Sequence, residues 1–345
     1  IVWGQRIFVT APVDGQDAAL AFDWSGKQLW QTTVGAESPG KHRNGSGSNP
    51  SPVTDGQSLF VYYKSGTLAA LEFDGGIRWQ TNLVQRFGRD TLFWDHGTSP
   101  ILTAKSVVMA RMHTGESWLA AFDKQTGQMQ WLEPRNYETP VEGDQSYATP
   151  IAVDHQGKEL ILVLGAEHLT AHDAGSGKLL WSCGGFNPEA IGYLPTVASA
   201  LLAGEIAVVP HGRERNSTLH GIKLGGSGDV TASHRLWKRE DTGTFVPTPA
   251  GYKGRIYLVR DRGEVECLDP ATGRTLWNAA LPKASASYYA SPALADGKLY
   301  AAREDGIVFV AKVDGKFEVL AENNLGERII ASPVPVANRL LLRGE

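Results

Sequence analysis

Histidine is the residue type in this sequence best suited to hold a transition metal, and nine histidines are present. His168 and His172 are four residues apart in a strand-like run, a spacing that holds their imidazoles too far apart to share an ion. Four other histidines fall in polar loops, at His42, His96, His113 and His211. The separations between these four histidines along the sequence are much longer than the spacing between ligands in metal-binding motifs. The histidines therefore predict no metal site.

The remaining reactive residues do not form a catalytic constellation either. Cys183 and Cys267 are 84 residues apart, which predicts two buried free thiols rather than a disulfide framework or a thiolate metal site. The sequence also lacks a Gly-x-Ser-x-Gly nucleophile motif, a phosphate-binding loop and a dinucleotide fingerprint. The prediction leans away from an enzyme.

Arginine and aromatic residues gather in the long polar loops and offer a different chemistry, the recognition of a partner. Arginine makes planar, bidentate contacts with carboxylates or phosphates, and exposed aromatic rings pack against proteins or sugars. Carboxylates in the same loops leave a second interpretation open, ion pairs between neighbouring repeats, and the aromatic rings could equally fill the interior. The candidate binding residues are His42, Arg43, Arg89, Trp94, Asp95, His96, Tyr137, Tyr147, Arg213, Arg215, Arg260, Tyr288, Tyr289 and Arg303.

A repeated unit alternates with these loops. A proline that precedes an apolar run recurs at Pro52, Pro100, Pro150, Pro195, Pro249, Pro292 and Pro333. A tryptophan recurs in register with it, at Trp30, Trp79, Trp131, Trp181, Trp237 and Trp277. Successive prolines are 48, 50, 45, 54, 43 and 41 residues apart. A period of this length indicates a repeat architecture.

The clearest unit, Thr248–Trp277, contains four short strand-like runs separated by turn residues. The first begins at Pro249, and the others are Arg255–Val259, Glu264–Leu268 and the surroundings of Thr275–Trp277. Four antiparallel strands in each repeat are typical of a β-propeller blade.

The link between the third and fourth runs, Asp269–Gly273, predicts a tight hairpin. Its proline presets one turn residue, and its glycine takes the position with positive φ. The same chemistry recurs at Asp123–Gly127 and Asp173–Gly177.

The sequence therefore predicts an all-β fold, a β-propeller of four-stranded antiparallel blades. Seven complete blades extend from Ile1 to about Asn323, the first ending near Val34, and an eighth blade has only two strands, Pro333–Val336 and Arg339–Leu342. A seven-bladed propeller is the alternative. No linker divides residues 1–345, which we expect to form a single domain. The sequence begins within a strand-like run, as processing or trimming would leave it.

Blade topology sorts the loops onto two faces. Loops between blades share one face with the loop that joins the second and third strands of each blade, and the remaining hairpins form the other face. The candidate binding residues fall on the first face. Lysines gather on the second, at Lys27, Lys124, Lys178, Lys298 and Lys316. We therefore predict that the first face carries the binding function.

Composition excludes some partners. The net charge is −4, with 33 basic and 37 acidic residues, so that no nucleic-acid partner is expected. No segment approaches the ~18 consecutive apolar residues that a membrane-spanning helix needs.

The turn and the tryptophan together form the pattern Asp-x-x-(Thr/Ser)-Gly-x-x-x-Trp, which ends at Trp131, Trp181 and Trp277. This pattern resembles the PQQ-like (quinoprotein-type) β-propeller repeat family, whose tryptophan docks between neighbouring blades. Other repeat families fit less well. The one Trp-Asp pair, Trp94-Asp95, lies in a connecting loop rather than at a blade end, and the paired glycines occupy different places in different repeats.

The resemblance implies two classes of function. Quinoprotein alcohol dehydrogenases bind pyrroloquinoline quinone with Ca²⁺, but they usually carry a pair of adjacent cysteines and are much longer, and no residue here can be assigned to the quinone or to calcium. The noncatalytic members, which include the outer-membrane assembly propeller of Gram-negative bacteria, present one face to partner proteins. We therefore expect a noncatalytic binding or scaffolding module without a cofactor, periplasmic or secreted in the cell envelope. A quinone-dependent oxidoreductase and a glycan-binding propeller are the alternatives.

Overall fold

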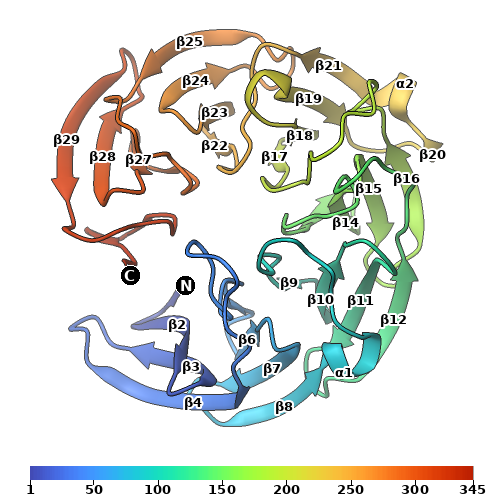
Figure 1. Ribbon diagram of the computed structural model, residues 1–345, viewed down its shortest axis with the longest axis vertical. Coiled ribbons are helices and arrows are strands. Elements are labelled where there is room, and N and C mark those ends of the chain that lie inside the picture. Colours follow the sequence, from blue (N-terminus) through green and yellow to red (C-terminus); the bar gives the residue numbers. More distant parts are fainter. Residues whose placement is uncertain (345) are drawn as a thin grey trace. The chain divides into compact units, whose positions relative to one another are not determined.

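The computed structural model describes residues 1–344, and these form an almost entirely β protein of 31 strands with three short helical turns. The chain divides into two compact units. The first comprises Ile1–Ala166 and Thr170–Leu180, and the second comprises Glu167–Leu169 and the chain from Trp181 onward. Both units are built from successive sheets whose strands pair antiparallel in chain order, apart from the added strand β20 (Figure 1). The expectation of a single domain stays a prediction.

The first unit contains three complete four-stranded sheets and most of a fourth. The first three sheets consist of β1 (Val2–Trp3), β2 (Arg6–Val13), β3 (Gln16–Phe22), β4 (Gln28–Ala36), β5 (Val53–Thr54), β6 (Ser58–Tyr62), β7 (Thr67–Glu72), β8 (Ile77–Asn82), β9 (Ile101–Leu102), β10 (Ser106–Arg111), β11 (Trp118–Asp123) and β12 (Met129–Pro134). Within this unit the fourth strands β4, β8 and β12 lie on the outer side (Figure 1). A short helix, α1 (Leu83–Phe87), follows β8.

The fourth sheet has one strand more than the repeat pattern predicts. It contains β13 (Ile151–His155), β14 (Lys158–Gly165), β15 (His168–Asp173) and β16 (Leu179–Cys183). A fifth strand, β20 (Gly228–Asp229), pairs with β16 in parallel, with Gly228 opposite Trp181. This strand and the short helix α2 (Thr231–His234) lie in the segment that leads to β21. The outer edge of a sheet is therefore able to accept another strand.

The second unit continues the series with three four-stranded sheets. They consist of β17 (Leu201–Ala203), β18 (Ile206–His211), β19 (Thr218–Lys223), β21 (Arg235–Arg239), β22 (Ala250–Tyr252), β23 (Arg255–Val259), β24 (Glu264–Leu268), β25 (Thr275–Ala280), β26 (Ala293–Ala295), β27 (Lys298–Ala302), β28 (Ile307–Lys312) and β29 (Glu318–Asn324). A single 3₁₀ turn, Glu214–Asn216, precedes β19.

The last sheet has two strands, β30 (Val334–Val336) and β31 (Arg339–Leu341), paired antiparallel. Leu340 and Leu342 pack against a small buried cluster that includes Ala302 and Val308 of the preceding sheet. Within residues 1–344, six sheets of four strands, one of four strands with β20 added, and an eighth of two strands confirm the predicted count, and the seven-bladed alternative is wrong.

The predicted hairpin turns form as the sequence requires. In the turn after β24, Asp269 Oδ1 accepts hydrogen bonds from the backbone N–H and the hydroxyl of Thr272, both at 2.9 Å. Gly273 then adopts φ 67°, a conformation that residues with a side chain rarely take. Asp123 and Asp173 organise the equivalent turns in the same way.

Four of the six recurrent tryptophans, at Trp30, Trp79, Trp131 and Trp237, donate their indole N–H to the turn of the next sheet. The Trp79 indole N–H donates to the backbone oxygen of Lys124 at 2.9 Å, and Trp237 donates to that of Pro270 at 2.8 Å. A Cβ atom on Gly273 would come within 2.5 Å of the Trp237 ring. The turn glycine is therefore required twice, for its φ and for the approach of the ring.

Two tryptophans depart from this arrangement. The indole N–H groups of Trp181 and Trp277 are buried and have no hydrogen-bond partner among residues 1–344. Where the turn glycine would be expected, Trp277 meets the ring of Phe317, with ring centroids 5.7 Å apart. At this junction the indole therefore contributes ring packing rather than a hydrogen bond to the next turn.

Candidate partner-binding surface

Asp95 organises the longest predicted binding loops of the first unit. Its buried carboxylate accepts from the backbone N–H of Lys41 at 2.8 and 2.9 Å and from that of His42 at 3.2 Å. The Lys64 ammonium group contacts it at 2.6 Å. A Cβ on Gly45 would overlap the same carboxylate, which explains the glycine. Asp95 therefore holds the loop near His42 in place and is not itself available to a partner.

Three rings stand on this loop framework, and we call His42, Phe93 and Trp94 the aromatic patch. Phe93 is 58% and Trp94 41% exposed. The two rings meet edge to face with centroids 4.9 Å apart, and Trp94 meets the half-buried His42 in the same way at 4.7 Å. Two large exposed rings in contact are uncommon on a protein surface and are typical of a site of interaction.

The backbone of the aromatic patch is fixed from a neighbouring loop. The amide of Phe93 donates to Gln145 Oε1 at 2.9 Å, and the amide of Trp94 donates to the Tyr147 hydroxyl oxygen at 3.0 Å. The Tyr147 hydroxyl in turn donates to Gln145 at 3.1 Å. Burial raises the pKa of Tyr147 to about 12, so that the hydroxyl stays protonated. Tyr147 therefore positions the patch.

His96 and Arg111 form the support beneath these loops. His96 Nε2 is 3.1 Å from the carbonyl oxygen of Thr98, and its ring packs on Tyr62 at 5.0 Å between centroids. Burial lowers the pKa of His96 to about 4, so that the imidazole is neutral near pH 7. Arg111 donates to the backbone oxygens of Phe87 and Gly88 at the carboxyl end of α1. Neither side chain is exposed.

The remaining predicted residues of the first unit, Tyr137, Arg43 and Arg89, belong neither to the aromatic patch nor to its support. Tyr137 is half-buried, with its ring 5.1 Å from the guanidinium carbon of the buried Arg135. Arg135 donates to Thr170 Oγ1 and to the carbonyl oxygen of Gly165, each at 2.9 Å. Arg43 and Arg89 are exposed. These two arginines are the members of the predicted set in this unit that are exposed to a partner.

In the second unit, Arg213 and Arg215 are exposed on the loop that precedes β19. The Arg213 guanidinium lies 5.9 Å from the ring centre of Phe245. Between the two arginines, Glu214 has φ 51°, a left-handed conformation unusual for a residue other than glycine. Arg260 and Tyr289 are half-buried. This loop is a second cationic candidate surface.

Tyr288 and Arg303 were predicted to contact a partner, but both are buried. Arg303 donates to Asp305 Oδ1 at 2.8 Å and to the carbonyl oxygen of Pro282 at 2.9 Å, and the Tyr288 hydroxyl donates to the same carbonyl at 3.3 Å. Arg303 is therefore paired within its own loop and anchored to the loop before its repeat, rather than forming the predicted ion pair between repeats. Polar residues in loops do not reveal from sequence alone whether they point outward, which is why the prediction did not separate these from Arg213 and Arg215.

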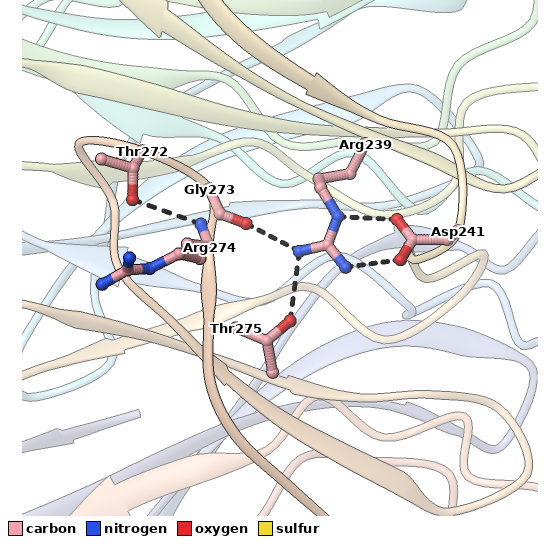
Figure 2. Close-up of a pocket in the computed structure, with 6 residues that line it drawn as sticks. All are labelled: Arg239, Asp241, Thr272, Gly273, Arg274 and Thr275. Carbon is pink, nitrogen blue, oxygen red and sulfur yellow. Dashed lines mark hydrogen bonds and ion pairs between the residues drawn. The ribbon is translucent and has the colours of Figure 1, made fainter.

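An open depression of about 450 Å³ lies on the second unit and is lined by Arg239, Asp241, Thr272, Gly273, Arg274 and Thr275. Figure 2 shows that Arg239 is already occupied: it contacts both carboxylate oxygens of Asp241 at 2.6 and 2.7 Å and donates to the Gly273 carbonyl at 2.7 Å. These bonds neutralise the charge that would attract an anion. The depression lies between the end of β21 and the turn that precedes β25, and we assign it no ligand.

Metal-ligand chemistry is sparse in the part of the chain that the structure describes. No group of three His, Cys, Asp or Glu side chains gathers within residues 1–344. Cys183 and Cys267 are both buried free thiols. Over the same residues no helix is long and apolar enough to cross a membrane.

Solved structures with the same fold include both classes that the repeat pattern implies. BamB from Moraxella catarrhalis is 15% identical with a TM-score of 0.66, and the match covers 99% of this chain and 96% of that chain. A europium-containing methanol dehydrogenase is 12% identical with a TM-score of 0.69, over 96% of this chain and 79% of that one. The quinohemoprotein alcohol dehydrogenase from Comamonas testosteroni is 12% identical with a TM-score of 0.66, covering 94% and 68%. These similarities establish the β-propeller fold.

No curated protein sequence matches the chain significantly. The family model described as outer membrane protein assembly factor BamB matches residues 16–184 and 227–318, which is more than half of the chain. The matched segments contain the aromatic patch, the hairpin turns and all six recurrent tryptophans. The chain therefore belongs to the PQQ-like propeller family of the outer membrane protein assembly factor BamB.

Proposed function

We propose that this protein is a noncatalytic scaffolding module of the cell envelope that binds a protein partner through the aromatic patch of its first unit. The observation that carries the proposal is the pair of exposed rings, Phe93 and Trp94, whose backbone amides are both hydrogen-bonded to a neighbouring loop. Rigid exposed aromatic side chains lose little conformational entropy on binding and often dominate the energy of an interface. The envelope location rests on the description of the family.

The surroundings of the patch suit a protein surface. Arg43 and Arg89 are exposed on the two loops that carry the rings and would form a polar rim around an apolar centre. The supporting side chains, Asp95 and Tyr147, are held by several contacts each, so that the free surface is already in its binding conformation. Preorganisation of this kind increases affinity without adding contacts.

The residues do not fit the alternative of a quinone-dependent oxidoreductase. Cys183 and Cys267 lie in different sheets, and no adjacent cysteine pair exists in the sequence. No three acidic or histidine side chains converge in residues 1–344 to hold the calcium ion that accompanies the quinone. We derive no redox step for this chain.

Affinity capture from envelope extracts tests the proposal. Tagged wild-type protein is compared with a Phe93→Ala, Trp94→Ala double variant, and partners retained by the wild type alone are identified by mass spectrometry and purified for titration calorimetry. We expect the double variant to weaken binding of the purified partner by at least about 30-fold, as loss of a central aromatic anchor does. Leu29→Ala with Leu276→Ala is the control, since these exposed apolar residues lie on outer strands.

Two results would contradict the proposal. Retention of the same partner at unchanged affinity by the double variant would exclude the patch, and its loss from Arg213→Ala, Arg215→Ala protein would move the site to the second unit. Binding of the wild type to a polysaccharide array, with no protein captured, would favour the glycan-binding alternative.

A further inference from the structure

The two exposed arginines of the loop before β19 have no carboxylate partner within the second unit. Elsewhere in this unit Arg239 is paired with Asp241 at 2.6 Å, so that its charge is already neutralised. Arg213 and Arg215 are both exposed, and among residues 1–344 neither forms an ion pair. Two guanidinium groups on one short loop are therefore available to an anion from outside the chain.

The backbone of this loop closes tightly on itself. The carbonyl oxygen of Arg213 accepts from the backbone N–H of Asn216 at 3.0 Å, and that of Glu214 accepts from the backbone N–H of Ser217 at 3.1 Å. A Cβ atom on Gly212 would overlap the backbone oxygen of Asn216, which explains the glycine. The two arginines are therefore presented by a fixed turn, so that a partner does not have to order the backbone on binding.

A neighbouring loop, residues 242–246, supports one of the two guanidinium groups. A Cβ atom on Gly243 would lie 2.8 Å from the carbonyl oxygen of Thr218, so that this loop lies directly against the start of β19. Its half-buried Phe245 ring lies beneath the Arg213 guanidinium, with 5.9 Å between the guanidinium carbon and the ring centre. The amide of Phe245 donates to Asp261 Oδ2 at 3.3 Å. The ring attracts the cation through its face and leaves the N–H donors at the guanidinium edge unoccupied.

The donors of this turn suit a pair of carboxylates. A guanidinium group is a planar fork of N–H donors that matches one carboxylate with two parallel hydrogen bonds. Glu214, the carboxylate between the two arginines in sequence, is exposed and forms no ion pair within residues 1–344. Anionic lipid surfaces are bound by clusters of about four to eight basic side chains, whereas this turn has two. An acidic protein segment therefore fits the turn better than a lipid surface does.

We propose that Arg213 and Arg215 form a docking site for an acidic segment of a partner protein, in which two carboxylates of the segment each pair with one guanidinium group. The Phe245 ring holds the Arg213 side chain in place and supplies an apolar surface beside the ion pairs. This site belongs to the second unit, and its binding does not depend on the aromatic patch of the first.

Titration with acidic peptides tests the site. Fluorescein-labelled peptides that carry two glutamates at different spacings are mixed with the whole protein at low salt, and binding is followed by fluorescence anisotropy. We expect at least one spacing to bind, and its glutamine counterpart to bind at least about tenfold more weakly. Arg213→Ala with Arg215→Ala should weaken binding by about tenfold or more. Arg213→Lys with Arg215→Lys should weaken it by about threefold or more, because lysine keeps the charge but lacks the fork.

Two control variants make the result specific. Arg255→Ala with Arg274→Ala removes two other exposed arginines of the same unit, changes the net charge equally and should bind the peptide like the wild type. The Phe93→Ala, Trp94→Ala variant should also bind like the wild type, which separates this site from the aromatic patch. Equal weakening in either control would overturn the proposal. The same holds if no peptide binds to the wild type, or if vesicles of phosphatidylglycerol bind where the peptides do not.

Discussion

Buried neutral histidines give this protein a predictable sensitivity to acid. His172 is held by contacts of 2.9 Å to the Gly177 carbonyl and 3.0 Å to Thr170 Oγ1, and burial lowers its pKa to about 4. His96 and His211 have similarly lowered pKa values, and that of His220 falls to about 3. The unfolded chain, with histidine pKa values near 6.5, binds protons more readily than the folded protein.

Replacement of His172 by leucine tests this linkage. Because the folded pKa is lowered, the stability contributed by the neutral imidazole is complete above pH 6.5 and is lost as the pH falls towards 4. One group with this shift accounts for about 3 kcal/mol of unfolding free energy across that interval. We expect His172→Leu to flatten the pH dependence of urea unfolding by about this amount. An unchanged slope between pH 6.5 and 4 would show that His172 is protonated in the folded state.

At the residue scale, the sequence located the polar loops of the candidate binding surface. It did not show which of their side chains are exposed to a partner. Trp94 and Arg213 are exposed as expected, whereas Asp95, His96, Tyr288 and Arg303 are buried. Loop composition does not report side-chain direction, because an arginine can satisfy its donors with backbone oxygens as Arg303 does.

At the scale of elements, the tryptophan junctions differ in strength. Trp237→Ala removes a nearly buried indole, its hydrogen bond to Pro270 and its packing on Gly273, and should lower the unfolding free energy by about 3–5 kcal/mol. Trp277→Ala should cost less, because the indole N–H of Trp277 is buried without a partner and its removal relieves that penalty. Trp94→Ala should cost less than either, since its ring is exposed.

Denaturant unfolding followed by circular dichroism ranks the three variants. Equal losses for Trp237→Ala and Trp277→Ala would show that the hydrogen bond to the turn contributes little. A loss for Trp94→Ala as large as for Trp237→Ala would mean that the loop around Trp94 is part of the core.

The two-stranded sheet of β30 and β31 should open more readily than the complete sheets. Within residues 1–344 it has only two strands, and Leu340 and Leu342 pack against the small cluster of the preceding sheet. Native-state hydrogen exchange should show protection factors at Val334–Val336 and Arg339–Leu341 at least about tenfold below those of Arg255–Val259, because few buried contacts oppose local opening. Equal protection would show that another segment completes this sheet.

The elements that follow directly from local chemistry were predicted from the sequence, and the exceptions were not. The turn at Asp269–Gly273 and the strands beside it match the expected ranges to within a few residues, because the turn residues fix the register. Strand β20 was missed since two residues carry no periodic pattern and its pairing depends on β16, far away in the sequence.

At the scale of the whole molecule, the fold alone does not decide between a scaffold and an enzyme, because the same architecture occurs in BamB and in methanol dehydrogenase. We expect the protein not to retain pyrroloquinoline quinone. Protein mixed with quinone and Ca²⁺, then separated from free cofactor, should show neither the quinone absorbance nor dye-linked alcohol oxidation above a buffer control. Stoichiometric retention with turnover would make this chain an oxidoreductase.

The lock between a tryptophan and the following turn has a consequence for how such a protein can change in length. The second and third sheets carry both halves of the lock: Gly75 and Gly127 receive the ring of the preceding sheet, and Trp79 and Trp131 reach the turn of the following sheet. Duplication or deletion of a gene segment that encodes one of these two repeats would therefore leave the neighbouring junctions matched. Changes by whole repeats preserve the fold, whereas a break within a repeat would separate a ring from its glycine.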